Sequence, residues 1–351
     1  MRDFKSTTTS FKPRGLATHI GSLPHVDPEE ACQLVLRYLP EIPAWPQLPH
    51  RSFLENMYAQ FSQGFPGLIL EEDHLWVDRE VDLSPELERL YDDCLEGRLE
   101  PYALSPDYAA GLQAFLQSRL DSPLAVKGQV TGPVSFGLVI GDQNHRPIIY
   151  DDSLAEAIAR HLKLKASWQE KVLSALFPRT IIFLDEPYLG SLGSAFVAVP
   201  PQKAEGLVVE VLEGVRGLKG IHCCGNADWP FLLRLPIDIL SLDAYNFGES
   251  LALRPAEVKA FLERGGVLAW GIIPNDEETL SRETVASLIS RLQELLLLLS
   301  NKGVNYDILV EQSLITPSCG LASLSPELAE RALKLTAEVS KELRRLGTKW
   351  S

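Results

Sequence analysis

Short apolar segments that suit buried strands alternate with longer amphipathic segments that suit helices along almost the whole chain. Apolar runs bounded by turn residues are typical of strands buried on both faces, whereas an apolar period close to that of the α-helix indicates helices. The alternation therefore predicts β–α units arranged around a parallel sheet. The predicted strands are residues 15–22, 44–48, 124–129, 180–184, 220–224, 237–242, 267–273 and 308–315.

Strands and helices that alternate in this way favour a (β/α)₈ TIM barrel, in which parallel strands close into a sheet inside a ring of helices. The rival fold is a doubly wound open sheet, because the same alternation produces it. The barrel is favoured because unusual residues follow predicted strands in nearly every part of the chain, and a barrel collects the carboxyl ends of all its strands at one mouth. The predicted helices are residues 28–39, 52–62, 153–176, 202–215, 254–263, 277–300 and 326–344.

We therefore expect a single α/β domain over residues 1–351, with an insertion at residues 64–106 in its amino-terminal third. A barrel of this kind needs about 250 residues, so the chain has room for an insertion. This segment contains two apolar triplets around an acidic turn and then an acidic stretch with helical character, which predicts a hairpin followed by a helix. It is interpreted either as a lid over the barrel mouth or as a decorative insertion.

The chain carries 33 Lys and Arg against 47 Asp and Glu, which gives a net charge of −14. Nucleic acid phosphates repel such a chain, so no nucleic-acid partner is expected. The longest apolar run, residues 295–299, is far shorter than the roughly 20 residues of a membrane span. Residues 1–9 lack the apolar stretch of a secretory signal, and an odd number of scattered cysteines does not suggest a disulfide framework. We therefore expect a cytoplasmic protein with no membrane partner.

A possible metal site begins with His222 and Cys224, which follow a short apolar strand. Side chains two residues apart share one face of a strand, so these two point together while Cys223 points away. Cys319 follows another strand much later in the chain, and barrel closure can bring the two strand ends together. One imidazole and two thiolates suit zinc. The alternative is that the cysteines are ordinary core residues and that the histidine satisfies a backbone group.

Five sequence motifs are distributed over nearly the whole chain. They are Thr18-His19-Ile20-Gly21-Ser22-Leu23-Pro24, Val130-Thr131-Gly132-Pro133-Val134, Leu184-Asp185-Glu186-Pro187, His222-Cys223-Cys224 and Pro317-Ser318-Cys319-Gly320-Leu321. In their order, these motifs resemble the catalytic domain of cobalamin-independent methionine synthase. Its wider superfamily includes uroporphyrinogen decarboxylases and the corrinoid-to-coenzyme M methyltransferases, all of them (β/α)₈ barrels. The chain is similar to the single-barrel core form, without the second barrel of the folate-dependent enzyme.

The resemblance implies that His222, Cys224 and Cys319 bind Zn²⁺. The family has a glutamate as a further zinc ligand at a strand end between the two cysteine motifs, and Asp243 stands near that place here. The resemblance also implies that Asp185 and the Ile20-Gly21-Ser22 segment bind the amino-acid end of homocysteine, and a looser match adds Glu55 to these residues. The neighbouring Glu186 could exchange roles with Asp185, or Asp185 could simply cap the next helix.

The identity of the methyl donor is inferred from a difference between this chain and the family pattern. The folate-dependent enzyme uses a histidine to protonate its leaving group, but the corresponding residues 269–275 contain no histidine. A cobalt(I) corrinoid leaves without protonation. We therefore predict a zinc-dependent methyltransferase that moves a methyl group from methylcobalamin or a methylated corrinoid protein to homocysteine and forms methionine. Trp45, Trp229 and Trp270 could form a platform for the corrin ring, although aromatic core packing explains them equally well.

Several alternative functions stay open at this point. The donor could be methyltetrahydrofolate, or the acceptor could be another thiol such as coenzyme M. Asp185 favours an acceptor with an ammonium group, because a sulfonate would require a cation instead. A decarboxylase would not need a thiolate metal site. Outside catalysis, the chain could be a corrinoid-binding or metal-binding partner protein.

Overall fold

A curled parallel sheet lies at the centre of the computed structural model, which describes residues 11–194 and 197–347. Its order is β1-β10-β9-β8-β7-β6-β4, and every neighbouring pair of strands is parallel. The polar segment 1–9 that argued against a secretory signal lies outside the described residues. The strands are β1 (Leu16–Ala17), β4 (Val126–Thr131), β6 (Thr180–Asp185), β7 (Leu218–Cys223), β8 (Ile239–Leu242), β9 (Val267–Ile273) and β10 (Ser313–Pro317).

The gap between β1 and β4 is filled by residues 43–47, which completes the predicted (β/α)₈ barrel. The strand predicted at residues 44–48 is therefore present only as isolated parallel bridges. The physical reason is its prolines, since Pro43, Pro46 and Pro49 lack the N–H groups that a continuous ladder needs. The closing hydrogen bonds run from Lys127 N–H to Pro43 O (2.9 Å), Trp45 N–H to Lys127 O (3.3 Å), Gln47 N–H to Gly21 O (3.0 Å) and Leu23 N–H to Gln47 O (2.9 Å).

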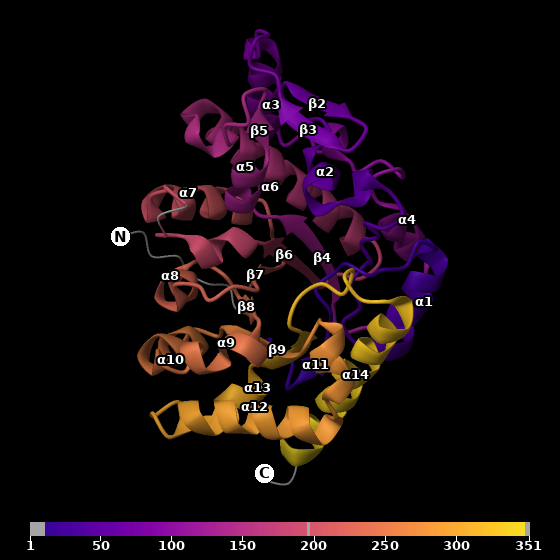
Figure 1. Ribbon diagram of the computed structural model, residues 1–351, viewed down its shortest axis with the longest axis vertical. Helices are drawn as coiled ribbons and strands as arrows, with labels where there is room; N and C mark the ends of the chain where they lie inside the picture. The colour runs from indigo at the N-terminus through magenta and orange to yellow at the C-terminus, as the bar shows by residue number, and fades with distance from the viewer. Residues whose placement is uncertain (1–10, 195–196, 348–351) are drawn as a thin grey trace.

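Helices surround the strands on the outside of the barrel (Figure 1). Most of the predicted helices are present, and Ser52, Asp276 and Ser325 each accept a hydrogen bond from a backbone N–H group of the following turn. The helices are α1 (Pro28–Tyr38), α2 (Met57–Ser62), α4 (Ala110–Gln117), α5 (Pro133–Val139), α6 (Asp152–Ser174), α7 (Pro201–Leu212), α8 (Trp229–Arg234), α9 (Ala244–Leu251), α10 (Pro255–Glu263), α11 (Glu277–Arg282), α12 (Val285–Ser300), α13 (Tyr306–Glu311) and α14 (Pro326–Gly347).

The elements predicted over residues 277–300 and 308–315 differ from the structure for local reasons. The helix expected over residues 277–300 is divided, because Thr284 forms a capping box with Ser287 and starts α12 anew. The strand expected over residues 308–315 begins only at Ser313. Its first part belongs to α13, since Asn305 accepts a hydrogen bond from the Ile308 N–H and caps that helix.

The segment 64–106 contains the hairpin and helix that its sequence predicts. Strands β2 (Leu68–Glu71) and β3 (His74–Val77) pair in antiparallel fashion, and α3 (Ser84–Glu96) follows. The short strand β5 (Gly141–Asp142) joins this hairpin from outside the segment by pairing with β3. The hairpin and α3 project at the upper end of the molecule in Figure 1. A role of this segment as a lid stays a prediction.

The barrel interior changes from apolar to polar toward the carboxyl ends of the strands. Its apolar layer includes Ile181, Phe183 and Leu314. Trp45, Trp229 and Trp270, in contrast, are at most 2% exposed and pack into the main hydrophobic core, so they form no open platform for a corrin ring. No helix within the described part of the chain is both long enough and apolar enough to span a bilayer.

Candidate metal centre

His222, Cys224 and Cys319 converge at the carboxyl ends of the strands. The candidate ligand atoms of these three residues all lie within 4.8 Å of one another. His222 belongs to β7, Cys224 follows its last residue, and Cys319 lies in the loop after β10, with β8 and β9 between the two strands. Because all these strands are parallel, their carboxyl ends meet at one mouth, and residues far apart in sequence become neighbours.

His222 is oriented so that one ring nitrogen is left for a ligand. The imidazole is buried, and its Nδ1 lies 3.0 Å from the Ser241 hydroxyl oxygen on β8. Its Nε2 is buried without a hydrogen-bond partner. An Nδ1–H group that donates to Ser241 places the lone pair on Nε2, and this arrangement is typical of histidines that bind metal ions.

The cysteines in this region divide into two kinds. The Cys319 thiol donates a hydrogen bond to Cys224, which lowers the pKa of the Cys224 thiol to about 4 and raises the pKa of Cys319. One sulfur is therefore favoured as a thiolate even without a metal ion. Cys223 instead lies in the hydrophobic core, where burial raises the pKa of its thiol to about 12. This confirms that neighbouring residues at the end of β7 point to opposite faces.

Asp185 ends β6 and pairs in register with His222 on the neighbouring strand. The residue is only 8% exposed, and its Oδ1 atom has no hydrogen-bond partner. Burial raises the pKa of the carboxyl group to about 6, while the charge of Lys127 acts in the opposite direction. An unpartnered, buried carboxylate oxygen is suited to pairing with a cationic group of a ligand.

Glu186 has a different role from that of Asp185. One carboxylate oxygen accepts a hydrogen bond from the Val134 N–H (2.8 Å), and the other accepts from the Ser135 N–H (2.9 Å) and hydroxyl (2.6 Å). These bonds satisfy the first turn of α5, where the backbone N–H groups have no partners within the helix. Glu186 therefore stabilises a helix end, and Asp185 is the carboxylate left available to a ligand.

Residues 20–22 lie beside the loop that carries Cys319. The Ser22 carbonyl accepts a hydrogen bond from the Leu321 N–H at 2.9 Å. The two loops approach so closely that a Cβ atom added to Gly320 would lie 2.1 Å from the Ser22 hydroxyl oxygen. Gly21 is equally confined, because an added Cβ would lie 2.7 Å from the Gln47 side-chain oxygen. The predicted substrate segment and the predicted metal ligands therefore share the same mouth.

The other two predicted site carboxylates already have partners. Asp243 caps α9 by accepting hydrogen bonds from the N–H (2.9 Å) and side-chain amide (2.7 Å) of Asn246, and it lies outside the cluster of three ligands. Glu55, in a 3₁₀ turn before α2, accepts from the Leu48 N–H (3.3 Å) and from Arg51 (2.9 Å). Their roles as a zinc ligand and as a substrate contact stay predictions.

Two solved structures resemble this chain over nearly its full length. The first is a B12-independent methionine synthase from Shewanella sp. W3-18-1 in complex with selenomethionine, with 16% identity, a TM-score of 0.61, and coverage of 94% of this chain and 98% of that chain. The second is a methyltransferase from Methanosarcina mazei, with 13% identity, a TM-score of 0.55, and coverage of 94% of both chains. The chain shares the fold of these two proteins. No family model and no curated protein matches it.

Asn275 is a residue of this centre that sequence reasoning did not identify. Its side-chain oxygen accepts a hydrogen bond from the Ser318 hydroxyl (2.9 Å), and its amide donates to the Gly320 carbonyl (3.2 Å). It therefore holds the residues on both sides of Cys319. Its position just after β9 was visible in the sequence, but the loop that it contacts was not.

Proposed function

We propose that this protein is a zinc-dependent methyltransferase that forms methionine from homocysteine, with methylcobalamin or a methylated corrinoid protein as the methyl donor. The observation that carries the proposal is the convergence of one imidazole nitrogen and two sulfurs from remote parts of the chain. In the transfer, the carbon–cobalt bond breaks and leaves its electron pair on cobalt. A carbon–sulfur bond forms to the acceptor, and the thiol proton is released.

The donor set fits zinc. Two cysteine sulfurs and a histidine nitrogen are common zinc ligands, and three protein ligands leave one tetrahedral position for a substrate. The unpartnered Nε2 of His222 and the favoured thiolate of Cys224 are consistent with this use. A zinc ion held by these residues would lower the pKa of an arriving thiol, so that the acceptor reacts as the more nucleophilic thiolate.

The acceptor is inferred from the residues around the metal centre. Asp185 offers an unpartnered carboxylate oxygen to an ammonium group, and residues 20–22 lie beside the Cys319 loop. An α-amino acid thiol therefore fits this mouth better than coenzyme M, whose sulfonate the Asp185 charge would repel. The similar Shewanella protein is described in complex with selenomethionine, an amino acid of the same class as the proposed product.

The donor is inferred from the end of β9. This strand is followed by Pro274, Asn275 and Asp276, so no histidine stands there to protonate a folate leaving group. Because a cobalt(I) corrinoid needs no such proton, methylcobalamin suits the residues that are present.

Assays of the purified, zinc-loaded protein with each donor test this proposal. Methionine should form from homocysteine and methylcobalamin but not from methyltetrahydrofolate. The opposite pattern would contradict the proposed donor, and faster methylation of coenzyme M than of homocysteine would contradict the proposed acceptor. A protein that binds zinc but alkylates no thiol with any donor would instead be a metal-binding or corrinoid-binding partner.

Cys319→Ser tests the metal centre, with Cys223→Ser as the matched control. Both variants replace one cysteine near the barrel mouth, but only Cys319 belongs to the cluster. Cys319→Ser should weaken zinc binding by roughly 100-fold or more while the circular dichroism spectrum is retained, because losing a ligand costs at least as much as losing a partner of a ligand. Cys223→Ser should retain zinc. Zinc binding at wild-type strength in Cys319→Ser, measured by chelator competition, would show that Cys319 is not a ligand.

A further inference from the structure

Lys127 is a buried ammonium inside the barrel, below the metal centre. It lies on β4 and is completely inaccessible to solvent. Its Nζ donates a hydrogen bond to the Ile20 carbonyl at 2.7 Å and a longer one to the Gln129 side-chain oxygen at 3.3 Å. The same atom lies 4.4 Å from the centroid of the Phe183 ring. The side chain thus crosses the interior from β4 to the segment that follows β1.

Stability does not explain this lysine. Transfer of an ammonium group from water into a protein interior costs several kcal/mol, and neither hydrogen bond of Lys127 is to a carboxylate. Replacement of a buried charged group by an apolar one of similar shape is often neutral or stabilising. Burial lowers the pKa of the Lys127 ammonium to about 8, and the charge of Asp185 acts in the opposite direction. Its Nζ lies among two hydrogen-bond acceptors and the face of the Phe183 ring, which are surroundings that suit an ammonium group.

The contacts of Lys127 lead to the proposed acceptor site. Its short hydrogen bond holds the carbonyl of Ile20, the first residue of the predicted substrate segment. The next residues of that segment pack against Gln47, and the Ser22 carbonyl is hydrogen-bonded to Leu321 in the loop that carries Cys319.

We propose that Lys127 is a positioning residue that makes the site specific for thiols carrying an α-amino acid headgroup. It does so by holding the Ile20 carbonyl, and with it residues 20–22, in place beside Cys319. This inference rests on the proposed function. A thiol without the headgroup makes no use of residues 20–22 and does not depend on Lys127.

Lys127→Met tests this role, with Lys165→Met as the matched control. Lys165 is equally buried but lies on the outer helix α6, and its Nζ has no hydrogen-bond partner. Both substitutions remove a buried ammonium and keep a similar shape. Both variants should retain zinc and unfold at temperatures no lower than that of the wild-type protein. Only Lys127→Met should change acceptor binding.

The experiment compares the kinetics of the variants with two acceptor thiols. It also includes one binding measurement in which no reaction takes place. Lys127→Met should raise the KM for homocysteine by roughly 10-fold or more, as expected for loss of a charged hydrogen bond. The rate with 2-mercaptoethanol should stay within about 2-fold, since that thiol lacks the headgroup. Calorimetric binding of selenomethionine to the zinc-loaded protein should weaken in parallel. Lys127→Gln, which keeps a donor for the Ile20 carbonyl, should recover part of the affinity.

Three results would overturn this role of Lys127. One is a wild-type KM for homocysteine in Lys127→Met, and another is an equal loss of rate with both thiols. The third is failure of Lys127→Met to fold, because Lys127 would then be a structural residue. Failure of the proposed function is distinguishable, since the wild-type protein would then neither methylate homocysteine nor bind selenomethionine.

Discussion

Asp185 and Glu186 are consecutive acidic residues whose surroundings give them different chemistry. Glu186 receives three hydrogen bonds from the start of α5, whereas Asp185 Oδ1 receives none. Both are buried, and burial raises the pKa of Glu186 to about 7 and that of Asp185 to about 6. At the scale of single residues, the availability of a carboxylate to a ligand depends on which backbone N–H groups lie nearby.

Asp185→Asn should impair acceptor binding. The substitution keeps the shape but removes the charge, so kcat/KM for homocysteine should fall by roughly 30-fold or more, since leaving one partner of a buried charge pair alone costs about 2 kcal/mol or more. In the wild-type protein, kcat/KM should fall as pH decreases through about 6, where the carboxylate becomes protonated. This limb of the pH profile should be absent in Asp185→Asn, and an unchanged profile would contradict the role of Asp185.

The same pKa shift gives Asp185 a defined effect on stability. Because its pKa is raised from 3.8 to about 6 on folding, the folded state binds this proton more tightly than the unfolded state does. The contribution of Asp185 to the free energy of unfolding is therefore greatest below pH 3.8 and is lost as pH rises to about 6. Metal-free Asp185→Asn should consequently gain stability relative to the wild-type protein between these pH values, as measured by urea unfolding.

Asn275→Ala should weaken metal binding without unfolding the protein. The asparagine holds Ser318 and Gly320 around Cys319, so its loss frees the ligand loop. Zinc affinity should fall by roughly 10-fold to 100-fold, as for other residues that orient metal ligands. Asn305→Ala removes a helix cap away from the mouth and serves as the control. Equal zinc affinities of the two variants in a chelator competition would contradict this role for Asn275.

At the scale of secondary structure elements, the geometry of the candidate metal centre depends on how closely the strands β9 and β10 approach each other. The register between these strands shifts at Thr316 and Pro317, just before the Cys319 loop. Gly271 in β9 permits this arrangement, because a Cβ atom there would lie 2.8 Å from Ser318 Cα and 2.4 Å from the Leu242 carbonyl oxygen. A larger residue at position 271 would push apart the strands that position the ligands.

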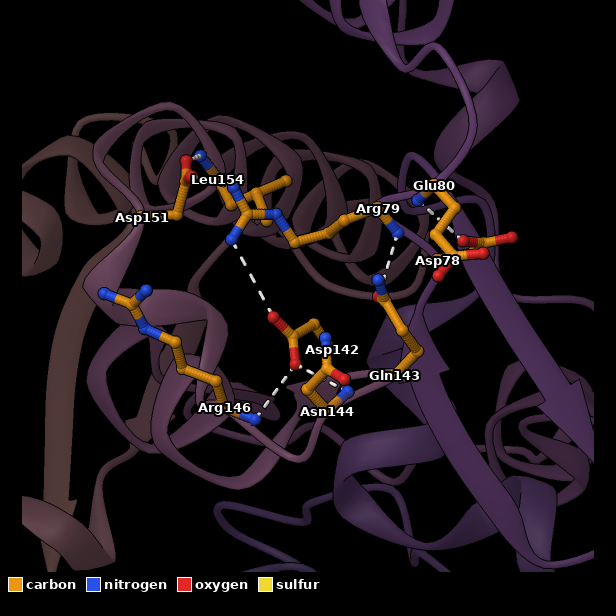
Figure 2. Close-up of polar contacts among 9 residues, drawn as sticks. All are labelled: Asp78, Arg79, Glu80, Asp142, Gln143, Asn144, Arg146, Asp151 and Leu154. Atoms are coloured by element: carbon orange, nitrogen blue, oxygen red, sulfur yellow. Dashed lines mark hydrogen bonds and ion pairs between the residues drawn. The ribbon is translucent and has the colours of Figure 1, made fainter.

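The hairpin segment 64–106 is joined to the start of α6 by ion pairs around Arg79. As Figure 2 shows, this side chain extends between Asp142 and Asp151, while its backbone N–H is bonded to Gln143. Its guanidinium lies 2.5 Å from Asp151 and 3.8 Å from Asp142. Asp151 also caps α6 by accepting from the Leu154 N–H at 3.0 Å. Arg79 therefore connects the hairpin region to the start of the long helix α6.

Arg79→Ala should loosen the hairpin segment 64–106 and leave the barrel stable. Partly exposed ion pairs contribute about 1 kcal/mol or less, so the unfolding temperature should change little. Hydrogen exchange should accelerate in β2 and β3, because the hairpin loses an anchor. Arg282→Ala, which breaks an exposed pair within α11, is the control. Unchanged exchange in the hairpin would show that Arg79 does not anchor it.

For the whole molecule, the proposed metal ion joins strands from different parts of the chain. His222 belongs to β7, Cys224 directly follows that strand, and Cys319 follows β10, so binding at this point stabilises only the closed barrel. A ligand of the folded state alone adds about 2.7 kcal/mol when its concentration is 100 times its Kd.

Metal removal should therefore lower the unfolding temperature while the secondary structure is retained. The hydrophobic core of the barrel does not include the ligands, so the metal-free protein should stay folded at 25 °C by circular dichroism. The stabilisation by added zinc, measured by differential scanning calorimetry, should disappear in Cys319→Ser. A zinc effect of equal size in that variant would place the bound metal elsewhere.

The alternation of apolar and amphipathic segments predicted a parallel sheet, because strand and helix periods are local properties of the chain. The unusual residues that follow many of the predicted strands then favoured the barrel over an open sheet. The alternation of side chains along a strand likewise predicted that Cys223 points away from His222 and Cys224. Most differences between the predicted and the observed elements result from prolines and helix caps that the predictions overlooked. Prolines interrupt the strand at residues 44–48, and Thr284 and Asn305 cap helices within predicted continuous elements.

The tertiary structure alone decided which polar groups meet. The sequence separations of His222, Cys224 and Cys319 do not reveal how far apart their side chains lie. Only the register of the closed barrel brings their ligand atoms within 4.8 Å of one another. The partners of Asp243, Glu186 and Asn275 were equally invisible, since a hydrogen bond depends on side-chain directions from separate strands. Sequence periodicity predicted the architecture and the motif resemblance pointed to the candidate reactive groups, whereas barrel closure determined which of them remain free to bind a ligand.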